Sequence, residues 1–293
     1  MFNRVAIVGL GLIGGSIGLA LHHARAAQQV VGYDLGKGIG ERARKLGAID
    51  QSYRALEDAV RGSELVIIAT PVGAIHALLQ KLATCLTPDT IVTDVASTKV
   101  QVIKWAEEFL PDSVSFVGGH PMAGKELSGV EASDANLFRN CVYCLTPTAH
   151  SRLVAVNRVS ALIDLLGAHV RFLEPAEHDR QVAGVSHLPF LASIALVNSV
   201  AGGSAWHDAS LLAASGFRDV SRLAAGNPEM YRDICLTNSE AVAYWLDEYI
   251  TTLHAMRESI AAHDKDLGEI FAKAQQLRLQ WQMSQSIDSV AKI

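Results

Sequence analysis

Three glycines near the N-terminus have the spacing of loops that bind the phosphates of a dinucleotide. Gly9, Gly11 and Gly14 follow an apolar run and open a helical pattern, with Leu12 and Ile13 between them. In a G-x-G-x-x-G loop the first glycine permits a tight turn and the second lets the backbone approach a pyrophosphate. The third lets the helix pack closely on its strand. We predict a dinucleotide site here; the alternative is a glycine-rich turn that only packs.

Asp34 ends the next predicted strand, twenty residues after Gly14. A carboxylate at this position binds the ribose hydroxyls of NAD and repels the 2′-phosphate of NADP. The alternative is NADP, because the nearby cation Lys37 could contact its 2′-phosphate. We therefore predict NAD as the cofactor.

Polar residues also follow the later predicted strands, at the sheet edge where hydride transfer would take place. Thr70 and Pro71 follow one strand, and Ser97 and His120 follow the next two. A histidine that titrates near neutral pH suits proton removal from an alcohol or enol-type hydroxyl, so His120 is the candidate general base. Two alternatives stay open: His120 as a loop histidine bonded to backbone, and Ser97 as the N-cap of a helix that begins near residue 99.

The C-terminal part of the sequence holds further candidates. His187 lies in an otherwise apolar helical pattern, where a hydrogen-bonded core histidine is the usual alternative. Arg218 and Arg222 are four residues apart and so share a helical face. An arginine pair suits a substrate that bears a carboxylate, although Arg218 has an ion pair with a nearby acid as its alternative.

The elements that would position these groups alternate between strand and helix up to residue 174. This alternation predicts an α/β fold with a Rossmann-type, mostly parallel sheet. Continuously apolar strands are expected where helices cover both faces of such a sheet. We expect strands at 5–8, 30–33, 65–69, 91–94, 114–117, 142–145 and 170–173, and helices at 16–25, 40–46, 75–85, 99–109 and 152–166.

From residue 175 onward the sequence shows only helical patterns. One of them starts at Asn227, an N-cap residue that Pro228 follows at the first helical position. We therefore predict an NAD-binding domain at 1–174 and an all-helical domain at 175–293.

Composition excludes several other classes of protein. The 293 residues carry a formal charge of −5, whereas proteins that bind nucleic-acid backbones are normally basic. Four cysteines do not make a disulfide framework, and the C-x-x-C of Cys141 and Cys144 has no second such pair and no H-E-x-x-H to complete a zinc site. The most apolar later stretch, 188–200, is shorter than the ~18 residues that a membrane span needs. We expect a soluble, cytoplasmic protein without a metal that acts on a small molecule.

Taken together, the motifs resemble the prephenate/arogenate (cyclohexadienyl) dehydrogenase family of tyrosine biosynthesis. The glycine loop is generic to Rossmann proteins, but His-Pro-Met-Ala-Gly followed by Ser-His-Leu-Pro is far more specific. The resemblance covers nearly the whole chain, and its segments are 9–16, 70–72, 94–99, 118–124, 186–189, 216–219 and 227–234.

This resemblance implies a reaction and roles for five residues. Prephenate and NAD would give 4-hydroxyphenylpyruvate, carbon dioxide and NADH, or arogenate would give tyrosine in the same way. The family histidine that matches His120 draws the proton from the ring hydroxyl, and the serine that matches Ser97 orients both that histidine and the hydroxyl. By the same resemblance, Glu126 would line and gate the pocket, His187 would face cofactor and substrate, and Arg222 would bind a substrate carboxylate.

The resemblance also implies a homodimer formed through the helical domain. Family members often carry a second histidine where this chain has Phe190, a change that removes a polar group near His187. Two other classes stay open: a Rossmann-plus-helical reductase of the β-hydroxyacid dehydrogenase or imine reductase type, and a non-catalytic NAD-binding regulator. The sequence leaves the choice between prephenate and arogenate open.

Overall fold

The computed structural model describes residues 1–125 and 127–290, with side chains described as far as residue 284. By its contacts the chain divides into two units, Met1–Val242 and Ala243–Ile293. The first unit contains the sheet, the helices around it and the described site residues predicted above.

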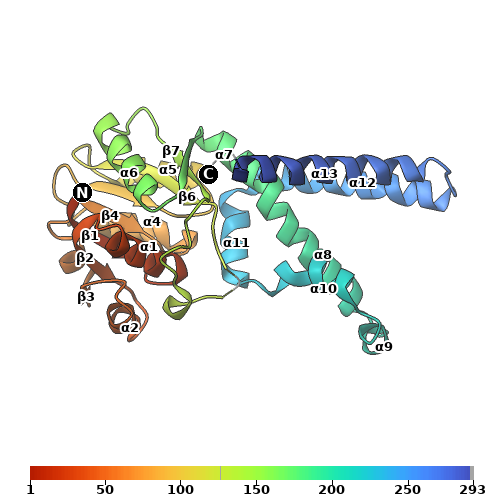
Figure 1. The fold of residues 1–293 in the computed structure, drawn as a ribbon, viewed down its shortest axis with the longest axis horizontal. Coiled ribbons are helices and arrows are strands. Elements are labelled where there is room, and N and C mark those ends of the chain that lie inside the picture. Colours follow the sequence, from red (N-terminus) through yellow and green to blue (C-terminus); the bar gives the residue numbers. More distant parts are fainter. Residues whose placement is uncertain (126, 291–293) are drawn as a thin grey trace. The chain divides into compact units, whose positions relative to one another are not determined.

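An eight-stranded sheet organises the first unit (Figure 1). Neighbouring strands run parallel in the order β3-β2-β1-β4-β5-β6-β7-β8, except that β6 and β7 are antiparallel. The order reverses between β1 and β4, the place where open α/β sheets bind their ligands. The strands are β1 Phe2–Val8, β2 Ala27–Tyr33, β3 Gln51–Tyr53, β4 Leu65–Ile68, β5 Ile91–Asp94, β6 Ser115–Pro121, β7 Val142–Thr146 and β8 His169–Phe172.

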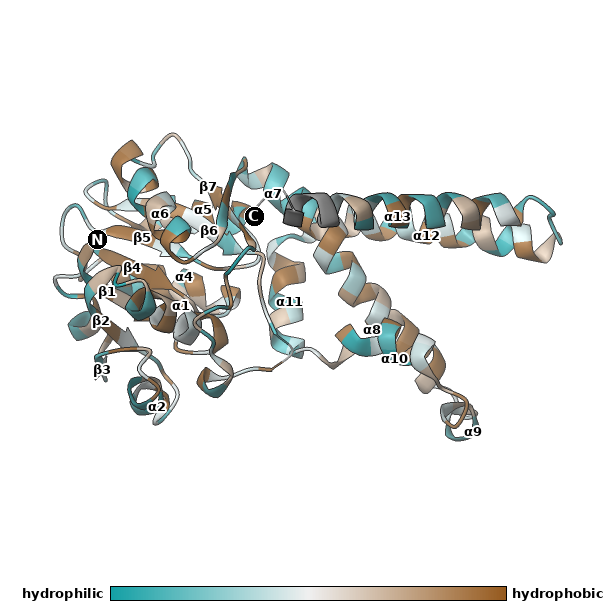
Figure 2. Cartoon of the chain, viewed as in Figure 1, coloured by the Kyte–Doolittle hydropathy of each residue, from teal (hydrophilic) through white to brown (hydrophobic). Residues whose placement is uncertain are grey.

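Helices cover both faces of the sheet because successive strand residues, which point to opposite faces, are apolar on both. Ile7 lies in a buried cluster with Ile17 and Val159, whereas Ala6 belongs to a second cluster with Leu79. The central strands are accordingly among the most hydrophobic parts of the chain (Figure 2). The helices are α1 Leu12–His23, α2 Ile39–Lys45, α3 Leu56–Val60, α4 Val72–Leu82, α5 Val100–Phe109 and α6 Leu153–Leu165.

The predicted fold class is confirmed, and each of the seven predicted strands is present. The structure differs from the prediction at two strands, β3 and β6. Strand β3 was missed because its three residues are too few to show a periodicity. Strand β6 continues to Pro121, where the sequence predicted a loop, because its end pairs antiparallel with β7 and sets His120 opposite Cys144.

The chain is helical after residue 174, as predicted, and α7 and α11 pack on α5 and α4 of the sheet region. The predicted cap is confirmed, because the Asn227 side chain accepts hydrogen bonds from the backbone N–H groups of Glu229 at 2.8 Å and Met230 at 3.1 Å. The helices are α7 Pro175–Val182, α8 Leu188–Ala201, α9 Trp206–Ser210, α10 Ser215–Ser221, α11 Pro228–Thr237, α12 Ser239–Ala261 and α13 Leu267–Val290.

Among the described residues, the run Pro175–Ala201 is long and apolar enough to cross a membrane by length and composition alone. Its first part does not fit a bilayer, because the Asp179 carboxylate accepts hydrogen bonds from the backbone of Lys99 and Val100 in the sheet region. The remainder, the π-helical turn Ala183–His187 and α8, contains the buried polar side chains of His187 and Ser193, and the Ser193 hydroxyl accepts the backbone N–H of Ala224 at 2.9 Å. The pattern therefore fits a helix of a folded protein.

Candidate active site

The loop between β1 and α1 needs its glycines for different reasons. Gly9 has a positive φ of 94°, and a Cβ added to it would lie 2.5 Å from the carbonyl oxygen of Ala69. A Cβ on Gly14 would lie 2.0 Å from the carbonyl oxygen of Gly9, so α1 packs directly on the loop. A Cβ on Gly11 would meet no atom within 4 Å. Within the described chain no side chain caps α1, so its first N–H groups can bind a phosphate.

Asp34 lies beside this loop at the end of β2. One carboxylate oxygen accepts the N–H of Leu10 at 2.7 Å, and the other accepts the N–H of Gly36 at 2.7 Å. The carboxylate thus holds the glycine loop to the strand end where a cofactor ribose would lie. Lys37 is exposed.

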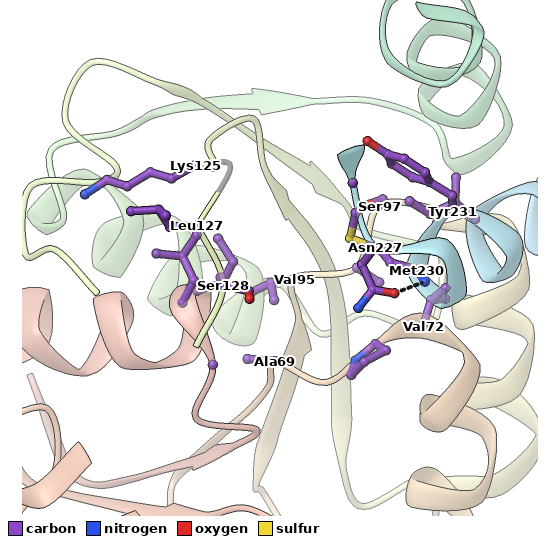
Figure 3. Close-up of a pocket in the computed structure, with 18 of the residues that line it drawn as sticks. Ala69, Val72, Val95, Ser97, Lys125, Leu127, Ser128, Asn227, Met230 and Tyr231 are labelled. Carbon is purple, nitrogen blue, oxygen red and sulfur yellow. Dashed lines mark hydrogen bonds between the residues drawn. The ribbon is translucent and has the colours of Figure 1, made fainter. Parts of the chain in front are cut away.

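A cavity of about 1130 Å³ opens at the carboxyl ends of the central strands. Figure 3 shows Lys125 and Leu127 on one side of it and Asn227 and Tyr231 on the other. Among the described lining residues, the charged side chains are Arg222 and Lys125, and Lys125 is paired with Asp134 at 2.8 Å. Arg222 therefore suits the cavity to an anionic ligand. Of the predicted site residues, Gly11, Leu12, Ile13, Thr70, Pro71, Ser97 and Arg222 line it.

His120 lies on β6 and is 8% exposed. It is not among the cavity-lining residues, and its Nδ1 lies 2.9 Å from Nε2 of His178. Burial, followed by the charges of His178, Lys99 and His187, lowers the pKa of His120 well below its ordinary value. The ring is therefore neutral at physiological pH and has a lone pair for a proton, but it does not titrate near neutral pH as the sequence led us to expect. A loop histidine bonded to backbone, the alternative left open by the sequence, is not what the structure contains.

A buried ion pair fixes the backbone next to His120. Lys99 is fully buried, and its Nζ donates to the Asp94 carboxylate and, at 2.7 Å, to the carbonyl oxygen of Gly119. The other Asp94 oxygen accepts the N–H of Gly119 at 3.1 Å. Burial lowers the pKa of Lys99, and the neighbouring Asp94 opposes that effect. Lys99 was not singled out from the sequence; the available signal was its partner Asp94, a charged residue at the end of an apolar strand.

The first turn of α5 is held by a residue from α7. The two carboxylate oxygens of Asp179 accept the backbone N–H groups of Lys99 at 2.7 Å and Val100 at 2.9 Å. Lys99, not Ser97, is the N-cap residue, so the N-cap alternative for Ser97 is wrong. One Asp179 oxygen also lies 2.8 Å from Nδ1 of His178. No local pattern marked either α7 residue, because their partners are distant in sequence.

His187 lies in the π-helical turn Ala183–His187 and is 1% exposed. Its Nδ1 is 3.4 Å from the Asn238 amide nitrogen, and its Nε2 has no hydrogen-bond partner among the described residues. Burial lowers the pKa of His187 to about 4, so the ring is neutral at physiological pH. His187 does not line the cavity. Phe190 next to it stacks on Tyr231, with ring centroids 4.0 Å apart, and Tyr231 does line the cavity.

The two predicted arginines have different surroundings. Arg222 opens the 3₁₀ turn Arg222–Ala225 and lines the cavity. Its charge acts on Tyr231, where it opposes the rise in pKa caused by burial. Arg218 lies on α10, away from the cavity lining, and is paired with Asp219 at 3.4 Å. Glu126 lies outside the described residues.

Two family models match the chain in succession. One, described as the nucleotide-binding domain of prephenate dehydrogenase, matches residues 17–172. The other, described as the dimerization domain of prephenate dehydrogenase, matches residues 174–275.

Individual proteins give the same result. A prephenate dehydrogenase of Bacillus subtilis is 36% identical over 273 residues, which cover 91% of this chain and 72% of the relative. A cyclohexadienyl dehydrogenase of Zymomonas mobilis is 34% identical over 282 residues, 95% of this chain and 96% of the relative. The crystal structure of A. aeolicus prephenate dehydrogenase with hydroxyphenyl propionate and NAD+ has a TM-score of 0.89 and 31% identity, and the match covers 96% of this chain and 98% of that one. This chain therefore belongs to the prephenate dehydrogenase family.

Proposed function

We propose that this chain catalyses the NAD-dependent oxidative decarboxylation of prephenate, arogenate or both, as in tyrosine biosynthesis. The observation that carries the proposal is the cavity where the dinucleotide loop, Ser97 and Arg222 meet, with cationic side chains as its described charged lining. A catalytic lysine in the helical part would instead favour a hydroxyacid dehydrogenase of similar architecture. The lysines of this part are Lys265, Lys273 and Lys292, late in the chain.

The cofactor proposed is NAD, and the residues around the glycine loop support it. Gly9 and Gly14 shape the turn, Gly11 leaves room for a pyrophosphate, and the uncapped α1 terminus offers N–H groups to it. Leu12, Ile13, Thr70 and Pro71 line the adjoining cavity wall, and the Asp34 carboxylate lies where it can accept the ribose hydroxyls. When bound, NAD supplies the acceptor for a hydride.

Ser97 and His120 are proposed to act on the ring hydroxyl of the substrate. As the C4 hydride leaves, His120 takes the hydroxyl proton and Ser97 orients the hydroxyl. When the ring carboxylate then leaves as carbon dioxide, its electron pair makes the ring aromatic. The oxygen takes the proton back from His120, so no net proton is consumed. Since aromatisation drives the reaction, the task of these residues is mainly to position the substrate.

The remaining predicted residues are proposed to bind the substrate or to support its site. Arg222 can pair with a substrate carboxylate through its planar, multiply donating guanidinium. His187 supports the site from the interior, as does Phe190 through its stacking on Tyr231. Glu126 is proposed, from the family resemblance alone, to line the pocket.

We further propose that residues 1–174 bind the cofactor and that residues 175–293 form a homodimer. The match to a dimerization domain supports the dimer. So do exposed apolar side chains in this range, among them Val185, Leu212, Val220 and Leu236. The four unbridged cysteines fit the cytoplasm as the proposed location.

The test is NADH formation, followed by absorbance, with prephenate, arogenate and simple hydroxyacids as separate substrates. We expect turnover with at least one cyclohexadiene and none with the hydroxyacids. Comparison of kcat/KM for prephenate and arogenate then decides between them. Absence of turnover with both cyclohexadienes would refute the proposal.

A further inference from the structure

Two buried residues link the proposed general base to helix α5. His120 Nδ1 lies 2.9 Å from His178 Nε2, and His178 Nδ1 lies 2.8 Å from an Asp179 carboxylate oxygen. All three side chains are buried. Asp179 is fixed on two sides, because its carboxylate accepts two N–H groups of α5 and its backbone carbonyl accepts the Asn238 amide at 2.8 Å. The series of contacts therefore has little freedom to move.

The carboxylate of Asp179, at the end of this series, determines which ring nitrogens carry hydrogen. A carboxylate offers only acceptors, so Nδ1 of His178 must donate its hydrogen to Asp179. When His178 is neutral, its imidazole carries one N–H, which leaves its Nε2 as an acceptor. Nδ1 of His120 must then donate to it, and Nε2 of His120 is left with a free lone pair.

We propose that His178 and Asp179 are positioning residues that hold His120 in the tautomer whose Nε2 accepts the substrate proton. The inference rests on the proposed role of His120 as general base. With the reverse polarity Nε2 of His120 would carry the hydrogen and could not take a proton. Because α5 follows directly after the Ser97 loop, the same carboxylate also fixes the start of the helix next to Ser97.

The same arrangement matters once His120 has taken the proton. The charges of Lys99 and His187 also act on the ring, and the charge of Lys99 opposes a second positive charge there. Nδ1–H of His120 continues to point at the Nε2 lone pair of His178, and behind it lies the Asp179 carboxylate. With His178 neutral, this hydrogen bond gives the imidazolium an acceptor in an interior where burial and the nearby charges disfavour it.

The direct test reads the tautomer itself. In the full chain labelled with ¹⁵N-histidine, ¹H–¹⁵N spectra distinguish protonated from unprotonated ring nitrogens, and His120→Asn assigns the His120 signals. We expect Nε2 of His120 to be unprotonated in the wild-type protein and the preference to be lost in His178→Phe, which keeps a ring but no acceptor. Protonated Nε2 in the wild-type protein would overturn the proposal.

Kinetics then separate positioning from packing. His178→Phe should lower kcat by about 10²-fold, the scale of general-base catalysis, with KM changed less than about threefold. The matched control is Glu177→Gln on the same helix, whose side chain contacts Gln181 and not His120; it should keep both tautomer and kcat. A lower kcat without a tautomer change in His178→Phe, or a tautomer change without a lower kcat, would contradict the proposal. If the wild-type protein turns over neither cyclohexadiene, the proposed function fails, while the spectra still decide the tautomer.

Discussion

Alanine at Gly11 should weaken NAD binding and spare the fold, whereas alanine at Gly14 should destabilise the fold. A Cβ on Gly11 meets no atom within 4 Å, so its cost to folding is limited to the N-cap preference, about 0.5 kcal/mol. The new methyl group instead occupies space that a pyrophosphate would approach. A loss of about 1.4–2.8 kcal/mol there corresponds to a Kd for NAD that rises about 10- to 100-fold.

Gly14 differs because its added Cβ would lie 2.0 Å from the carbonyl oxygen of Gly9. That atom belongs to the backbone of the glycine loop, so the contact can be relieved only by moving α1 or the loop. Overpacking of this kind costs about 1–3 kcal/mol, and the higher helix propensity of alanine recovers at most about 1 kcal/mol. We expect a net loss near 1–2 kcal/mol and a Tm lower by a few degrees.

Two measurements on the same pair of proteins check this reasoning. Calorimetric titration gives the Kd for NAD, and thermal unfolding without ligand gives Tm. The Gly14 variant serves as the control for general damage to the loop. Wild-type affinity in Gly11→Ala, or wild-type Tm in Gly14→Ala, would refute the assignment of these two glycines.

The remaining predictions concern the proposed site and pH. His120→Asn should lower kcat by about 100-fold or more with little change in KM; wild-type turnover would remove His120 as the base. Arg222→Ala should raise KM for the anionic substrate, while Arg218→Ala, exposed and paired with Asp219, should leave KM unchanged. Asp34→Asn should weaken NAD binding more than NADP binding, and equal effects would argue against ribose binding. Since burial lowers the pKa of His187 from 6.5 to about 4, the unfolded chain takes up that proton first as pH falls. The free energy of unfolding should therefore decrease between pH 6.5 and about 4, by at most about 3 kcal/mol, and His187→Leu should reduce that decrease in urea titrations.

The parts of the fold that were predictable from sequence are those with local patterns. The strand, glycine loop and helix at the N-terminus follow one another within a few residues, so their periodicity and turn chemistry can be seen directly. The same holds for the Asn227 cap, where acceptor and donors lie within three residues. Strand β3 has only three residues and was missed.

The surroundings of the proposed base could not be predicted in this way. His120 was expected in a loop because glycine and proline surround it, but antiparallel pairing with β7 extends the strand through it. Its contacts with His178, and those of Asp179 with α5, join residues far apart in sequence. Ser97 had the right residue type for an N-cap, but a carboxylate from α7 supplies the cap bonds instead. Tertiary partners, which leave no local pattern, decide these roles.

The net charge of −5 would suggest a poor host for a pyrophosphate and an anionic substrate, but the charge near the cavity decides binding. At physiological ionic strength charges are screened beyond about 8 Å, so distant acidic side chains contribute little. Lys125 on the lining is paired with Asp134 at 2.8 Å, whereas Arg222 lines the cavity and α1 begins at its wall with uncapped N–H groups. These groups act at short range and in a partly desolvated space, where an attraction between opposite charges is stronger than in water. An acidic chain can therefore bind two anionic ligands side by side, provided that its cations are at the cavity.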